Sequence, residues 1–284
     1  MATMTGGMMW RNVLLSGGAS LAAMAAAAPA MADSRIPLAA HRAVYDLSLA
    51  STKGDGAPAA ARGRMVFEFN GSACEGYSVN FRYLTEMQSQ EGQTVVSDMR
   101  SATFEDGESR NLDFKIETEN HGRGSAKIVD GHATKSGDGA LSLDLRSPKR
   151  TKVDLDEDVA FPTEQMVRTI AAARDGQRIA EMKVFDGSDD GEKIFSTLSV
   201  IGKAASTPSV EKPEIISALA EMRRWPVTVS YFDNSKKQDT PEYILTFDLY
   251  ENGVSGAMRL DYGSFVLKGE MSRLELLPGK ECGK

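Results

Sequence analysis

Residues 61–83 constrain the fold more than any other part of the chain. Their sequence, ARGRMVFEFNGSACEGYSVNFRY, contains two runs in which apolar and polar side chains alternate. Alternation with a period of two places one face of a strand against a core and the other toward water. The runs are separated by Asn-Gly-Ser-Ala-Cys-Glu-Gly, which is rich in turn-forming residues. The stretch therefore predicts a β-hairpin whose connecting turn carries Cys74.

Similar alternation recurs along most of the chain. The predicted strands cover residues 41–49, 94–104, 112–118, 127–129, 133–135, 141–145, 179–185, 193–201, 225–232, 243–250, 254–260 and 264–276. Asp130-Gly131 is interpreted as a turn, and Asn252-Gly253 gives the strongest hairpin signal. About a dozen strands at this spacing are typical of a mainly β domain of the barrel or spiral type.

One segment breaks the strand pattern. Residues 161–176 have apolar side chains at helical spacing, with Thr163 placed to cap the helix and Gly176 to end it. We expect this short, mostly apolar helix to be buried against a sheet. A second amphipathic helix is predicted over residues 213–224, where Ile215, Leu219 and Met222 share a side.

The N-terminus has the features of a secretory signal peptide. Arg11 is the only charged residue in the first 32 positions, residues 13–28 are apolar and small, and Ala30-Met31-Ala32 matches a cleavage signal. A membrane anchor is the alternative, but the segment is rich in alanine rather than leucine and no stop-transfer flank follows. We therefore predict a signal peptide over residues 1–32, a single β domain over residues 33–284, and export of the mature chain across the inner membrane.

The predicted export bears on the oxidation state of the two cysteines, Cys74 and Cys282. Two cysteines in an oxidising compartment most often pair. A bridge between them would close a loop of about 209 residues, which the loop-entropy model values at roughly 5 kcal/mol as an upper figure. The alternative is a redox or metal-binding role, which the lack of a C-x-x-C motif disfavours.

Charge and motifs argue against several classes of function. The formal net charge of −7 disfavours a nucleic-acid partner. The sequence contains neither G-x-S-x-G nor H-E-x-x-H. His41 lies among apolar strand residues and is interpreted as structural, whereas His121 and His132 are interpreted as solvated turn residues. We expect no cofactor and no catalytic residue, although carboxylates that meet in a β fold leave a glycoside-cleaving enzyme open.

Two weaker site hypotheses remain. Asp186, Ser188 and Asp190 match the first half of a calcium-binding loop, but the position of the closing glutamate is Thr197, so a polar hairpin turn is the favoured interpretation. The second hypothesis is a ligand groove beside the predicted helix. Its candidate residues, which plain core packing would explain equally well, are Met166, Ile170, Tyr77, Tyr83 and Trp225.

Several segments, taken in order, resemble the cell envelope integrity family EipB, a periplasmic family of Gram-negative bacteria. They are HRAVYDLSL (41–49), RGRMVFEFNGSACEGYSVNFRY (62–83), FPTEQM (161–166), VFDGSDDGEKIF (184–195) and RRWPVTVSYF (223–232), followed by a cysteine near the C-terminus. The resemblance implies a β-spiral, an open barrel-like roll of antiparallel strands around one central α-helix, locked by a Cys74–Cys282 disulfide. Only these two cysteines carry over from the family.

The resemblance also implies a role in envelope integrity and stress resistance, with a link to a periplasmic tetratricopeptide-repeat protein. We therefore expect a non-enzymatic envelope protein that acts through a protein partner. The first alternative is a carrier or sensor of a lipid or other amphipathic ligand. The second is an enzyme that acts on the cell wall.

Overall fold

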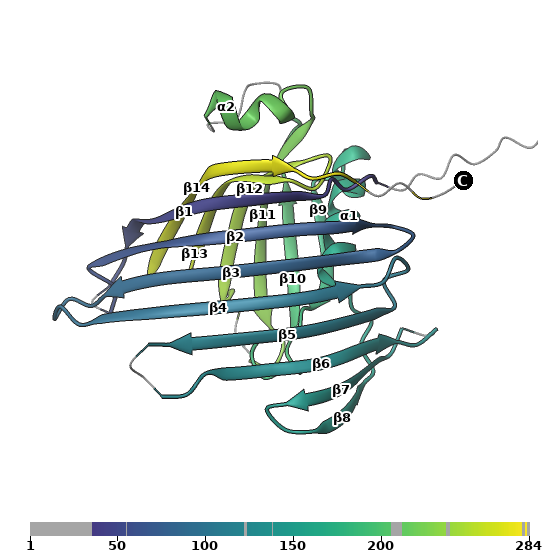
Figure 1. The fold of residues 1–284 in the computed structure, drawn as a ribbon, viewed down its shortest axis with the longest axis horizontal. Helices are drawn as coiled ribbons and strands as arrows, with labels where there is room; N and C mark the ends of the chain where they lie inside the picture. The colour runs from purple at the N-terminus through teal and green to yellow at the C-terminus, as the bar shows by residue number, and fades with distance from the viewer. Residues whose placement is uncertain are drawn as a thin grey trace, which may run out of the picture. The chain divides into compact units, whose positions relative to one another are not determined.

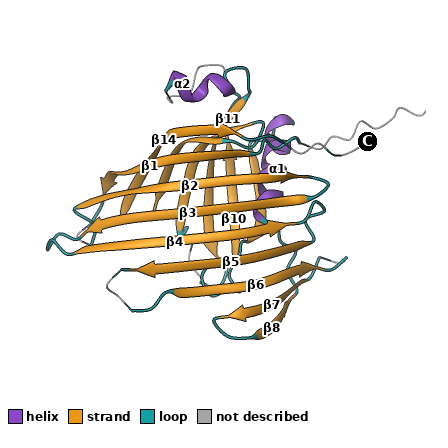
Figure 2. Ribbon diagram, in the orientation of Figure 1, coloured by secondary structure: helices purple, strands orange, loops and turns teal. Residues whose placement is uncertain are grey.

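Fourteen antiparallel strands form one sheet in the computed structural model (Figure 1). The structure describes residues 36–54, 56–121, 124–137, 139–205, 212–236, 239–279 and 282, so the predicted signal peptide lies outside the described residues. The strand order is β8-β7-β6-β5-β4-β3-β2-β1-β14-β13-β12-β11-β10-β9. Figure 2 shows that strands make up most of the fold, with helix α1 beside them. The mainly β, antiparallel prediction is confirmed.

The elements follow one another in the order that the alternation predicts, except that strand β8 is additional and two of the predicted strands are merged into β6. Their bounds are β1 His41–Thr52, β2 Ala60–Ser72, β3 Gly76–Gln88, β4 Thr94–Glu105, β5 Asn111–Asn120, β6 Lys127–Lys135, β7 Leu141–Ser147, β8 Thr151–Leu155, α1 Pro162–Arg174, β9 Ile179–Phe185, β10 Ile194–Ile201, α2 Pro213–Ile216, β11 Arg224–Asp233, β12 Tyr243–Tyr250, β13 Ser255–Asp261 and β14 Phe265–Leu276.

The first and last strands of the chain pair with each other inside the sheet. Strand β1 pairs with β2 on one side and with β14 on the other, so both ends of the described fold meet in the middle of the sheet. The free edges are β8 and β9, which are consecutive strands joined by α1. Figure 1 shows β2–β6 running across one layer and β9–β12 behind them, with α1 at one end of these layers.

The inner face of the sheet carries the apolar residues. One buried cluster joins β5, β6 and β7 to the segments on either side of α1, a second joins β1, β2, β13 and β14 to the α2 region, and a third packs α1 on β10–β12. Ile170 of α1 is fully buried in the third cluster. Burial of the helix against the sheet was predicted and is confirmed.

The predicted hairpin forms around Cys74. Strands β2 and β3 pair in register from Ala60↔Gln88 to Ser72↔Gly76, and Cys74 lies in the turn between them. Cys74 is bonded to Cys282, with the two Cα atoms 5.6 Å apart. The disulfide therefore ties the central hairpin to the end of the chain, as predicted.

Strand β6 corrects the sequence interpretation of Asp130-Gly131. These residues lie inside one continuous strand, Lys127–Lys135, at a register irregularity with β7 rather than at a turn. The glycine is needed for packing, because a Cβ atom at Gly131 would lie 2.6 Å from Cζ of Phe114. His132 is accordingly a strand residue and not the solvated turn residue that the sequence analysis expected.

Two further elements differ from the sequence analysis. Strand β8 was not predicted, but it pairs with β7 from Leu141↔Leu155 to Leu145↔Thr151. The helix expected over residues 213–224 is one turn of α2 followed by a 3₁₀ turn, Ser217–Leu219. It stops because Arg224 already pairs with Tyr250 in the sheet.

The start of α1 also differs from expectation. Phe161 occupies the N-cap position and Pro162 opens the helix, so Thr163 does not cap it. The side chain of Glu105 on β4 takes that role and accepts hydrogen bonds from the backbone N–H groups of Thr163 and Glu164. The helix ends as predicted before Gly176, whose φ is 74°. Within the described residues, no helix combines the length and apolar character needed to cross a membrane.

Candidate functional site

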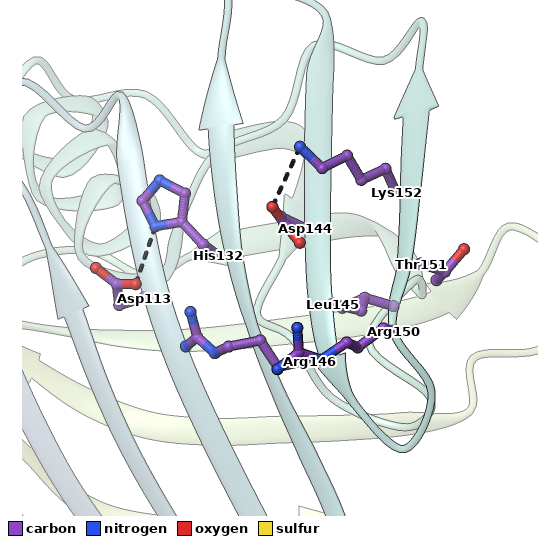
Figure 3. A pocket seen from close by; sticks show the side chains of 8 residues that line it. All are labelled: Asp113, His132, Asp144, Leu145, Arg146, Arg150, Thr151 and Lys152. Atoms are coloured by element: carbon purple, nitrogen blue, oxygen red, sulfur yellow. Dashed lines mark hydrogen bonds and ion pairs between the residues drawn. The ribbon is translucent and has the colours of Figure 1, made fainter.

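A wide hollow lies on the outer face of β5–β8 (Figure 3). It has a volume of about 770 Å³ and is open to solvent. Its lining is mostly charged and comprises Asp113, His132, Asp144, Leu145, Arg146, Arg150, Thr151 and Lys152. The size lies within the range of small-molecule sites, but such sites are mainly apolar and enclosed.

Strand register builds a charged ladder across this hollow. Asp113 on β5 pairs with His132 on β6, His132 with Asp144 on β7, and Asp144 with Lys152 on β8. Nδ1 of His132 lies 2.9 Å from Oδ1 of Asp113, and Nζ of Lys152 lies 3.4 Å from Oδ2 of Asp144. Residues directly opposite each other in antiparallel strands share a face, so the ladder follows from the register. Cross-strand pairs of opposite charge stabilise a sheet modestly.

The His132–Asp113 pair has two of the three groups of a hydrolytic triad. An aspartate that binds Nδ1 of a histidine leaves Nε2 able to serve as a base for a nucleophile. Thr151 supplies the only hydroxyl among the lining residues, but it pairs with the buried Leu145 and so belongs to the inner face, whereas His132 lies on the outer face. Figure 3 shows the two side chains on opposite sides of Asp144. The lining residues therefore make no nucleophile–base contact.

The basic side chains of the hollow differ in their partners. Arg146 donates a hydrogen bond to Oδ1 of Asp130 at 2.6 Å, so the carboxylate of Asp130 neutralises the charge of the Arg146 guanidinium. Arg150 is exposed and makes no ion pair with the residues that the structure describes. It is thus a guanidinium available to a group from outside the chain.

A second, smaller pocket of about 160 Å³ lies at the N-terminal end of α1. Tyr77 and Val167 line its apolar side, and Ser109 and Glu164 its polar side. This volume is below that of typical ligand pockets. Next to this pocket, Nζ of Lys135 donates to Oε2 of Glu164 at 2.5 Å and to the carbonyl of Val159 at 3.2 Å.

Glu105 lies buried beneath this end of the helix. Its Oε2 accepts the N–H of Thr163 at 2.8 Å, and its Oε1 accepts the N–H of Glu164 at 3.0 Å and the hydroxyl of Ser109 at 2.8 Å. Burial raises the pKa of the carboxyl group, and these hydrogen bonds oppose that shift only in part. All three of these carboxylate contacts are internal to the fold, so Glu105 acts as a structural cap between β4 and α1.

The structure separates the five residues of the proposed ligand groove. Met166, Ile170 and Trp225 belong to the cluster in which α1 packs on β10–β12. Tyr77 stacks on Phe69 and lines the small pocket. Tyr83 packs against the cluster around β1 and β14, and its hydroxyl lies 3.3 Å from that of Tyr262. The helix brings three of them together as core, and the other two lie elsewhere.

The candidate metal residues form a turn between β9 and β10. Asp186 accepts the N–H of Ser188 at 2.9 Å, and Asp190 accepts the N–H of Glu192 at 3.1 Å. These contacts are those of Asx turns. Among the described residues there is no group of three or more histidine, cysteine, aspartate or glutamate side chains that could hold a metal ion.

His41 is a buried structural residue, as predicted. Its Nδ1 donates to the carbonyl oxygen of Ala39 at 2.7 Å, and burial lowers the pKa of the ring. Sequence reasoning missed the Asp113–His132 pair and the Glu105 cap. The pair had a signal in the sequence, because Asp130, His132 and Thr134 alternate with Gly131 and Ala133 as a strand requires.

Comparisons with known proteins agree with this geometry. The sequence model of the family described as EipB-like matches residues 32–278. The cell envelope integrity protein EipB of Brucella abortus (strain 2308) is 35% identical over 257 residues, and the match covers 88% of this chain and 88% of that protein. The crystal structure of a β-barrel-like protein of domain of unknown function DUF1849 from Brucella abortus matches with a TM-score of 0.79 and 35% identity, over 86% of this chain and 100% of that chain.

Proposed function

The chain belongs to the EipB-like family, and from that membership we propose that it helps to maintain cell envelope integrity as an exported, periplasmic protein. The proposal includes removal of residues 1–32 as a signal peptide. A disulfide between distant cysteines supports an oxidising compartment, since such bonds rarely persist in a reducing cytosol.

The proposed mode of action is binding of another envelope protein rather than catalysis. The observation that carries it is the outer hollow of β5–β8, an open surface whose lining is charged and whose His132 contacts no hydroxyl of the lining residues. Open, polar surfaces suit protein partners better than small substrates. The partner that the family resemblance favours is a periplasmic tetratricopeptide-repeat protein.

Affinity capture from envelope extracts tests this function. The mature protein is immobilised, and bound proteins and lipids are both identified by mass spectrometry. We expect a tetratricopeptide-repeat protein at an amount near that of the bait, and it should also cross-link to the bait in intact cells. We then reverse the charges of Arg150 and Lys152, with Lys268→Glu on β14 as the matched control. If only the first change abolishes the interaction, the partner binds at the hollow.

A lipid carrier is the second candidate function, and the pocket lined by Tyr77 and Val167 favours it. Its volume of about 160 Å³ is small for an acyl chain, so this function requires the pocket to widen. Recovery of a lipid without a protein would favour the carrier. Recovery of neither would remove both candidates and leave the cell-wall enzyme to be tested by substrate screening.

A further inference from the structure

The two free edges of the sheet differ in how they are covered. Strand β9 is shielded by the chain just before α1: Ala160 donates to the carbonyl of Lys183 at 2.8 Å and accepts from the N–H of Phe185 at 3.0 Å. The side chain of Lys183 also binds Glu157 of the same segment. The β9 edge is therefore partly occupied by the protein itself.

Strand β8 has no such cover. Its residues pair with β7, and no other described residue makes a backbone hydrogen bond to Thr151–Leu155. Val153 and Leu155 pack against the apolar cluster of β5–β7, which holds the strand in place. Figure 1 shows β8 as the outermost strand of its layer. An ordered edge with unpaired N–H and C=O groups is a template for a further strand.

The charges along this edge have opposite signs at its two ends. The segment RSPKRTK, residues 146–152, is basic, and DLDED, residues 154–158, is acidic. Val153 lies between them. Lys152 and Asp154 both point to the outer face and are exposed, as are Arg150 and Asp156 just beyond the strand. Neither Arg150 nor Asp156 makes an ion pair with the residues that the structure describes.

We propose that β8 pairs antiparallel with β8 of a second copy of this chain, about a two-fold axis at Val153. Antiparallel pairing centred there places Lys152 opposite Asp154 of the second copy, and Arg150 opposite Asp156. Each of these pairs occurs twice by symmetry. A run of charges of one sign would repel a second copy, whereas this sequence is complementary to its own reverse.

The pairing joins the two sheets edge to edge and keeps their faces aligned. Thr151, Val153 and Leu155 remain on the inner face in both copies, because directly opposed residues of antiparallel strands share a face. Each copy contributes a strand of only five residues, so the contact buries less surface area than a permanent dimer requires. The dimer is therefore concentration-dependent, and salt weakens it because its ion pairs are exposed.

Sedimentation velocity of the mature protein tests the proposal over about 1–200 μM, the range of a weak complex. We expect a monomer–dimer equilibrium that shifts to monomer in high salt. Arg150→Asp and Asp156→Arg each place like charges opposite each other, and each should weaken dimerisation by about tenfold. The exposed Lys268→Glu, on a central strand, should leave dimerisation unchanged.

Charge exchange separates pairing from general surface effects. The double variant Arg150→Asp/Asp156→Arg restores opposite charges and should dimerise like the native protein. An equimolar mixture of the two single variants should form heterodimers for the same reason. Val153→Cys, at the axis, should form an intermolecular disulfide on oxidation, since antiparallel partners have Cα atoms about 4.5–5.5 Å apart.

A native protein that stays monomeric across this range would overturn the proposal. So would a double variant or a variant mixture that remains monomeric while both single variants are folded. Self-association that Lys268→Glu abolishes equally would assign the contact to another surface. Capture of the tetratricopeptide-repeat partner is measured separately, so loss of either result leaves the other interpretable.

Discussion

The carboxylate of Glu105, at the end of β4, lies 2.8 Å from the backbone nitrogen of Thr163 in the first turn of α1. The two residues are 58 positions apart in the sequence, and the contact is buried. The first N–H groups of a helix have no partner within it. Glu105 satisfies two of them, and so fixes α1 between β4 and the strands on which the helix packs.

Removal of this cap should destabilise the protein. Glu105→Ala removes the acceptors of the N–H groups of Thr163, which is buried, and Glu164, which is partly buried, and we expect a loss of about 2–3 kcal/mol in the free energy of unfolding at pH 7. Glu105→Gln keeps one acceptor oxygen and should lose less. Urea unfolding measures both, with the exposed Glu108→Ala as control at below about 0.5 kcal/mol. Equal stability of Glu105→Ala and Glu108→Ala would contradict the capping role.

The same carboxyl group predicts a dependence of stability on pH. Burial raises the pKa of Glu105 above its usual value of 4.5, so the folded protein holds this proton more tightly than the unfolded chain does. The resulting stabilisation is complete below pH 4.5 and is lost as the pH rises through the folded pKa. Relative to Glu105→Gln, the native protein should therefore lose stability over that interval. Urea unfolding of both proteins from pH 4 upward measures this. A free energy of unfolding that rises with pH in the native protein relative to Glu105→Gln would contradict it.

Ile170 reports on the packing of α1. It is fully buried between the helix and β10–β12, and Ile170→Ala should cost about 2–5 kcal/mol through lost burial and the cavity left behind. Ile179→Ala is the matched control, because that side chain is 59% exposed, and should cost below about 1 kcal/mol. Thermal unfolding measures both. Similar costs for the two variants would mean that α1 does not pack as described.

Local patterns predicted much of the fold, and long-range contacts account for the errors. The β2–β3 hairpin has both its alternation and its turn within 23 residues, so local sequence was sufficient. The cap of α1 was misassigned to Thr163 because Glu105 is remote in sequence. Strand β8 was missed because it is short and runs into the acidic residues 154–158, which are typical of a solvated loop, and only pairing with β7 makes it a strand. The charged ladder through Asp113 and His132 depends on register, which alternation alone does not determine.

The disulfide should act as a single unit. Cys74→Ser and Cys282→Ser each open the same bond, so each should lower the free energy of unfolding by a similar amount, about 2–5 kcal/mol. The double variant should cost no more than either single variant, because one bond cannot be lost twice. Thermal unfolding with and without reductant measures this, and reductant should leave the double variant unchanged. A double variant far less stable than both single variants would show that the cysteines have separate roles.

Gly131 is expected to tolerate no side chain despite lying inside a strand. An added Cβ would lie 2.6 Å from Cζ of Phe114 and 2.8 Å from Cδ2 of Leu145, both of which belong to a closely packed cluster. Gly131→Ala should therefore cost about 1–3 kcal/mol through overpacking, although alanine favours extended backbone more than glycine does. Gly137→Ala is the control, since nothing lies within 4 Å of its added Cβ. Combination with Phe114→Leu should recover part of the loss, because the smaller side chain makes room for the methyl group. Strictly additive costs in the double variant would show that Phe114 is not the residue that excludes a side chain at position 131.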